Sequence, residues 1–82
     1  MSLSIHEDEI IADLAVAQKF KFSVHRNKGG WSYKTRHVLL TELKREVVEL
    51  EEALALGNKE AIISEAADIA NYLAMLIEKV KK

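Results

Sequence analysis

The sequence predicts an all-α protein, and three observations lead to this fold class. Proline is absent from the 82 residues and glycine occurs only three times, so few residues interrupt regular structure. Apolar side chains recur every three or four residues in three successive segments, which is the spacing of one face of an α-helix. No segment shows the apolar–polar alternation that is typical of a β-strand. We therefore expect a single helical domain over residues 1–82.

The first helix is expected to begin at Ser4 and to end at about Phe22. Ser4 and Glu7 have the S-x-x-E spacing of a capping box, in which two side chains satisfy each other's backbone N–H groups. Apolar positions follow at helical spacing: Ile10, Leu14, Ala17, and Phe20 or Lys21. The stretch 23–34 is expected to be irregular, because it contains the helix-breaking pair Gly29-Gly30.

Two antiparallel helices are expected over the rest of the chain. Thr35 is placed to cap the second helix, and Gly57 is placed to end it. Asn58 is placed to cap the third helix, so the connection is short enough for the two helices to lie side by side. The apolar stripes that we expect to face the core are Leu39, Leu43, Val47, Leu50 and Leu54, and then Ile62, Ile69, Leu73, Leu76 and Val80.

A chain of this length builds only a small hydrophobic core, which usually needs an additional support. Cysteine is absent, so disulfides and thiolate metal sites are excluded. An oxygen-ligated metal and a partner chain remain as supports. No apolar run approaches the roughly 20 residues of a membrane span, and the N-terminus lacks the features of a signal peptide. We expect a soluble cytoplasmic protein with no membrane partner.

The charges are balanced overall but are unevenly distributed. The net charge of −1 gives no general attraction to nucleic acid. Residues 19–37 nevertheless carry six lysines and arginines and no acid, whereas residues 42–52 carry five glutamates and two bases. This pattern suits a polyanion that binds together with a cation, or two complementary surfaces of an oligomer. Nucleic-acid binding through the basic stretch is a weaker alternative, because the acidic segment would oppose it.

Two acidic pairs, Glu46-x-x-Glu49 and Glu65-x-x-Asp68, border the two apolar stripes when residues are placed at about 100° each. Four carboxylates that converge at the edge of a core repel one another. A hard divalent cation relieves this repulsion through oxygen ligands, and Mg²⁺ commonly binds substrate phosphates as well. The alternative is that each pair lies on a solvated face and forms salt bridges. Spacing alone does not decide between the two.

The same residues resemble a known signature. The order E-x-x-E, 15 residues, E-x-x-D is similar to that of the MazG-like, all-α nucleoside triphosphate pyrophosphatases. The leucine-rich segment 39–50 and the segment 65–73, with its tyrosine, also resemble the family. Trp31 stands where many members have a tryptophan in the substrate-binding loop, and Arg45 stands where many have a second acid. The resemblance extends from about Lys28 to Ile77.

The resemblance implies a Mg²⁺-dependent hydrolase, with Mn²⁺ as an alternative ion. It would cleave a ribo- or deoxyribonucleoside triphosphate between the α and β phosphates, giving the monophosphate and pyrophosphate. Glu46, Glu49, Glu65 and Asp68 would bind the metal, and Glu46 and Glu49 are the candidate catalytic carboxylates. Members of the family form homodimers or homotetramers, in which antiparallel helices of two chains build a four-helix bundle.

The candidate substrate-binding residues are Trp31, Lys28, Lys34, Asn71 and Tyr72. Each has a structural alternative: the indole packs the loop onto the helices, the lysines are surface charges, and the asparagine bonds across helices. For the whole chain, the alternative function is a non-catalytic helical oligomerisation or regulatory module whose acids form salt bridges between helices.

Overall fold

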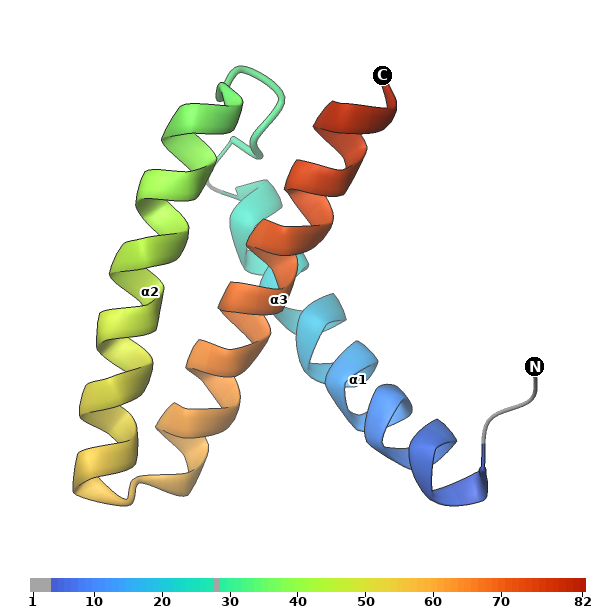
Figure 1. The fold of residues 1–82 in the computed structure, drawn as a ribbon, viewed down its shortest axis with the longest axis vertical. Coiled ribbons are helices and arrows are strands. Elements are labelled where there is room, and N and C mark those ends of the chain that lie inside the picture. Colours follow the sequence, from blue (N-terminus) through green and yellow to red (C-terminus); the bar gives the residue numbers. More distant parts are fainter. Residues whose placement is uncertain (1–3, 28) are drawn as a thin grey trace.

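The computed structural model describes residues 4–27 and 29–82, and all regular structure in these ranges is helical. Three helices follow one another: α1 (Ile5–Asn27), α2 (Arg36–Leu56) and α3 (Lys59–Lys81) (Figure 1). The predicted all-α class is confirmed. No described helix is both long and apolar enough to span a membrane.

The start of α1 is the predicted capping box. The backbone N–H of Ser4 donates to Oε1 of Glu7 at 2.8 Å, and that of Glu7 donates to Oγ of Ser4 at 3.1 Å. The end of α1 differs from the prediction, because the helix continues past Phe22 to Asn27. Ser23 does not break the helix, since its hydroxyl donates to the carbonyl of Phe20 at 2.7 Å.

The predicted connection between α2 and α3 is confirmed in detail. Thr35 Oγ1 accepts the N–H of Val38 at 3.2 Å at the start of α2. Gly57 ends α2 in the left-handed conformation, with φ 68°. Asn58 Oδ1 then accepts the N–H of Ala61 at 3.1 Å and caps α3. The two helices consequently run antiparallel and side by side, as Figure 1 shows.

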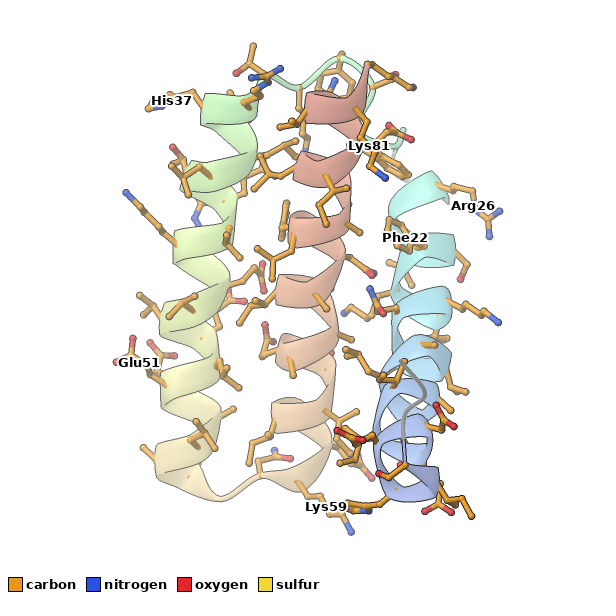
Figure 2. All side chains as sticks on the ribbon, turned by 45° about the vertical axis from the view of Figure 1, so that its right-hand side comes forward. Phe22, Arg26, His37, Glu51, Lys59 and Lys81 are labelled. Carbon is orange, nitrogen blue, oxygen red and sulfur yellow. The ribbon has the colours of Figure 1, made fainter. Side chains whose placement is uncertain are left out.

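The first helix packs against α3, and among the described residues its Cα atoms stay more than 8 Å from those of α2. Phe22 points from α1 towards α3, whereas Arg26 points away from it (Figure 2). The loop between α1 and α2 adds Trp31, whose ring lies 5.2 Å from that of Phe22 between centroids. One chain therefore supplies a helical hairpin and one crossing helix.

The core is smaller than the two predicted apolar stripes. Its buried apolar members are Leu39, Ala53, Ala67, Tyr72 and Met75. Leu39, Tyr72 and Met75 form one cluster, against which half-buried side chains of all three helices and of the loop pack. The predicted core residues Leu54 and Val80 are instead 57% and 64% exposed. Leu43, Leu50, Ile62, Ile69 and Leu76 are half-buried, and Val47 and Leu73 are exposed. The stripes are wider than a single neighbouring helix can cover.

Candidate functional site

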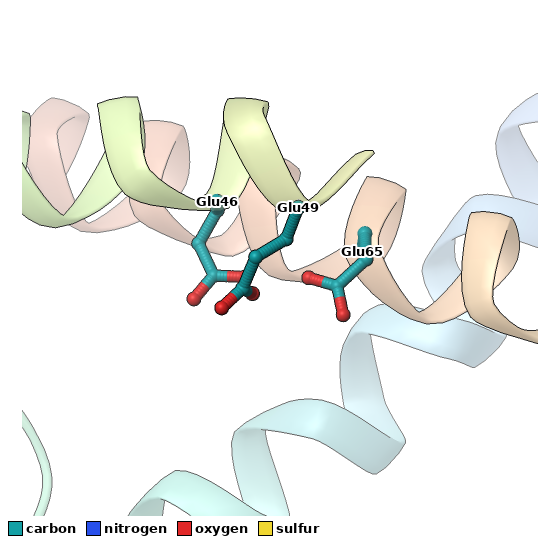
Figure 3. Close-up of side chains that lie close together, drawn as sticks. All are labelled: Glu46, Glu49 and Glu65. Carbon is teal, nitrogen blue, oxygen red and sulfur yellow. The ribbon is translucent and has the colours of Figure 1, made fainter. Parts of the chain in front are cut away.

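Three glutamates converge on one side of the hairpin. Glu46 and Glu49 lie one turn apart on α2, and Glu65 lies opposite them on α3 (Figure 3). One carboxylate oxygen of each lies within 4.8 Å of the other two. The Gly57 turn sets the antiparallel register that brings these segments together, so the two acidic motifs do meet across the hairpin.

Two of these carboxylates have a buried oxygen for which the described residues supply no donor. Oε2 of Glu46 and Oε2 of Glu65 are buried, and neither accepts a hydrogen bond within the described part of the chain. Burial raises the pKa of Glu46 to about 9, helped by its contacts with the carboxyl groups of Glu65 and Glu49 and by the charges of Asp68 and Glu49. Burial also raises the pKa of Glu65. A hydrogen bond with Glu46 acts to lower this pKa, but the contact with Glu49 and the negative charges of Glu49 and Asp68 raise it further, so the net shift is upward. The cluster is thus short of positive charge.

Asp68 lies next to this cluster but is not one of the three converging residues. It is buried on α3, one turn after Glu65, and its Oδ2 lies 3.2 Å from Nζ of Lys21 on α1. The same ammonium donates to Oγ of Ser64 at 3.1 Å. Sequence reasoning missed this role of Lys21, although its position in the apolar spacing of the first helix was a signal that the side chain turns inward.

A polar hollow of about 320 Å³ lies beside the glutamates. Its lining is Gly30, Tyr33, Lys34, Glu42, Arg45, Glu46 and Tyr72. Lys34 Nζ lies 2.8 Å from Oε2 of Glu42, on the wall of this hollow. Glu46 belongs to both the hollow and the glutamate cluster, so a ligand in the hollow would contact basic side chains and an acidic group together.

Two groups in this hollow have shifted pKa values. Burial acts to raise the pKa of Glu42, but hydrogen bonds from Lys34 and Tyr72 and the charges of Lys34 and Arg45 outweigh it, so the pKa is lowered. The pKa of Tyr72 is raised by burial, by its hydrogen bond to Glu42 and by nearby carboxylates. Tyr72 is therefore neutral near pH 7, and its hydroxyl proton is donated to Glu42.

Trp31 and Asn71 are both engaged in contacts between structural elements. The indole Nε1 of Trp31 donates to Oε1 of Glu78 at 3.3 Å, and the ring lines a separate hollow of about 360 Å³ with Lys19, Phe22 and Arg26. Asn71 is fully buried, and its Nδ2 donates to the carbonyl of Gln18 on α1 at 3.0 Å. Of the other predicted substrate residues, Lys34 and Tyr72 line the hollow beside Glu46, and Lys28 lies outside the described residues.

Comparison of the chain with protein-family models, with curated proteins and with solved structures finds no significant match. The chemistry of the site therefore has to be argued from its own residues. These are three clustered carboxylates, two of which have a buried oxygen that accepts no hydrogen bond, and an adjoining hollow with basic groups.

Proposed function

We propose that the chain is a divalent-metal-dependent nucleoside triphosphate pyrophosphohydrolase, which converts a (d)NTP and water to a (d)NMP and pyrophosphate. The observation that carries this proposal is the convergence of Glu46, Glu49 and Glu65, in which Glu46 and Glu65 each have a buried oxygen that accepts no hydrogen bond from the described residues. A cytoplasmic location fits a chain that has no cysteine to be oxidised.

The donor set suits Mg²⁺ or Mn²⁺, because it consists of carboxylate oxygens alone. Glu46, Glu49 and Glu65 would hold the ion. When bound, such an ion neutralises phosphate charge and activates a water. A bound cation would also remove the repulsion that raises the pKa of Glu46 and Glu65 in the protein alone.

The hollow beside the cluster supports a phosphate-containing ligand. Lys34 and Arg45 line it and can form charge-assisted hydrogen bonds to phosphate oxygens. Tyr72 lines the same wall and donates its hydroxyl proton to Glu42, so it helps to hold that carboxylate beside the hollow. Glu46 and Glu49 remain the candidates for orienting the attacking water, because Glu46 lines this hollow and an oxygen of Glu49 lies within 4.8 Å of one of Glu46.

We also propose that the protein is a homodimer or homotetramer whose hairpins form four-helix bundles. The chain exposes 6183 Å², whereas a compact monomer of its mass would expose about 5,000 Å². Five exposed apolar residues of the hairpin form what we call the apolar face: Val47, Leu54, Leu73, Ile77 and Val80, all at least 40% exposed. Packing two such faces together would bury them in helix-on-helix contact.

The activity is tested with a panel of dNTPs and NTPs in the presence of Mg²⁺, with pyrophosphate and orthophosphate measured separately. Pyrophosphate release is expected, and Glu49→Gln should reduce turnover at least about 100-fold because it removes a charged metal ligand. Glu52→Gln is the matched control, because Glu52 is an exposed glutamate of α2 outside the cluster. Release of orthophosphate alone, or full activity of Glu49→Gln, would contradict the proposal.

The second candidate function is a non-catalytic helical module. One observation favours it: Lys21 and Asp68 form a largely buried ion pair between α1 and α3, as expected for acids that join helices. The glutamate cluster distinguishes the two functions. A structural module gains nothing from three acids without a cation, whereas a metal site requires them.

A further inference from the structure

Asp68, the fourth acidic residue of the region, is paired with a cation of the protein itself. Its Oδ2 lies 3.2 Å from Nζ of Lys21, and the two side chains are only 11% and 21% exposed. Ser64 Oγ accepts a hydrogen bond from the same ammonium at 3.1 Å. Lys21 is thus held between Ser64 and Asp68, which flank Glu65 on α3.

The position of Lys21 is fixed by the docking of α1. One turn earlier, the carbonyl of Gln18 accepts the hydrogen bond from the fully buried Asn71 at 3.0 Å. Gln18 and Lys21 are therefore neighbours on one face of α1, opposite Asn71 and Asp68, which are neighbours on α3. Two parallel contacts between the helices place the ammonium, so it does not behave as a mobile surface charge.

Resting on the metal site proposed above, we propose that Lys21 is a positioning residue that holds Asp68 out of the metal coordination shell. The metal is then held by the three glutamates alone. Lys21 occupies one oxygen of Asp68, and its positive charge beside the cluster opposes the approach of a second cation. The docking of α1 therefore limits the affinity of the site for divalent ions.

The charges of the region give the direction of the effect. Four carboxylates and one ammonium leave a formal charge of −3 if all are ionised, and loss of Lys21 makes it −4. That loss also removes one cationic partner of Asp68, an acidic side chain one turn from Glu65. Both changes favour a divalent ion, so removing Lys21 should tighten metal binding rather than weaken it.

The test is a titration of the protein with Mn²⁺ alone. Binding is measured by calorimetry and by the electron paramagnetic resonance signal of free Mn²⁺. Lys21→Met should bind Mn²⁺ about fivefold or more tightly than the wild type. Lys19→Met removes the same charge from an exposed position of α1 and should bind as the wild type does. Lys21→Arg keeps the charge and should restore wild-type affinity. The double variant Lys21→Met/Asp68→Asn should lose the gain.

A second comparison does not depend on how well Lys21→Met folds. Asp68→Asn should weaken Mn²⁺ binding much less than Glu65→Gln, because only Glu65 is a ligand. Circular dichroism and Trp31 fluorescence report whether α1 remains docked, since Trp31 packs on Phe22 of that helix.

The outcomes separate the two proposals. Equal Mn²⁺ affinity in the wild type, Lys19→Met and folded Lys21→Met would overturn the role of Lys21 and leave the metal site standing. Weaker Mn²⁺ binding by folded Lys21→Met than by the wild type would also overturn the role of Lys21 alone. Equal losses of Mn²⁺ affinity in Asp68→Asn and Glu65→Gln would have the same consequence. A wild-type protein that does not bind millimolar Mn²⁺ would overturn the metal site and the role of Lys21 together.

Discussion

Glu46 is the residue at which folding and the proposed function oppose each other. Folding moves its carboxylate next to those of Glu49 and Glu65 and buries one of its oxygens without a donor. Such an arrangement costs stability in the protein alone, as the raised pKa of Glu46 also indicates. Groups that are costly to the fold and cluster beside a hollow are typical of functional sites.

Glu46→Gln should therefore stabilise the metal-free protein while it weakens Mn²⁺ binding. With EDTA at pH 7, we expect the Tm to rise by about 4 °C or more, because glutamine removes the cost of protonating a carboxyl whose pKa rises on folding. Thermal unfolding followed by circular dichroism measures the change, with Glu52→Gln as the control. A lower Tm for Glu46→Gln would instead support acids that stabilise the helices through salt bridges.

Glu42 has the opposite electrostatic environment and gives a pH prediction. Its pKa is lowered in the folded protein, so ionised Glu42 contributes stability above the usual value of 4.5. This contribution is lost as the pH falls through the lowered folded pKa. Glu42→Gln should have a lower Tm than the wild type at pH 7, and the gap should close towards pH 3. A gap that stays constant over this range would show that the Lys34 and Tyr72 contacts do not stabilise the charged form.

The turn between α2 and α3 sets the register of the acidic motifs at the scale of the elements. Gly57 has φ 68°, and a Cβ at this position would meet no other atom within 4 Å. The cost of Gly57→Ala is therefore backbone strain alone, and we expect a loss of about 1 kcal/mol in the free energy of unfolding. Urea unfolding measures it. Gly57→Asn should cost less, because asparagine tolerates the left-handed conformation; equal losses would point to another cause.

Local signals predicted the helices well because capping depends on residues close in sequence. Ser4, Thr35, Gly57 and Asn58 all act as their sequence context indicated. The end of α1 was placed too early because serine is tolerated inside a helix when its hydroxyl bonds to the preceding turn, as Ser23 does.

The features of the site that the sequence did not predict are those that depend on tertiary contacts. The meeting of Glu46 and Glu49 with Glu65 followed from the periodicity of two antiparallel helices. The pairing of Asp68 with Lys21 did not, because it depends on how α1 crosses α3, and no local pattern encodes that crossing. The predicted burial of the apolar stripes is confirmed for Leu39 and is wrong for the exposed residues Val47, Leu54, Leu73 and Val80, because burial depends on which helices are present to cover a stripe.

At the scale of the whole molecule, the apolar face and the glutamates lie on separate sectors of the two helices. At about 100° per residue, Leu73 lies about 80° around α3 from Glu65, and Val47 lies about 100° around α2 from Glu46 and about 160° from Glu49. The excess of about 1,200 Å² over a compact monomer exceeds the roughly 800 Å² that each partner contributes to a standard interface. A second copy on the apolar face would therefore complete the core and leave the glutamates of each chain free.

Leu73→Glu tests this arrangement. Leu73 is 48% exposed in the single chain, so a charge there should disturb the monomer little but should be costly in an apolar interface. Light scattering coupled to size exclusion should give a mass at least twice 9.3 kDa for the wild type and 9.3 kDa for the variant. Val48→Glu is the matched control: Val48 is 51% exposed but lies about 100° around α2 from Val47, away from the apolar face, so this variant should stay oligomeric. Dissociation by Val48→Glu alone would place the interface on the other side of α2.

The dissociated Leu73→Glu protein should still bind Mn²⁺, because all three glutamates belong to one chain. Loss of Mn²⁺ binding on dissociation would mean that the partner chain completes the metal site.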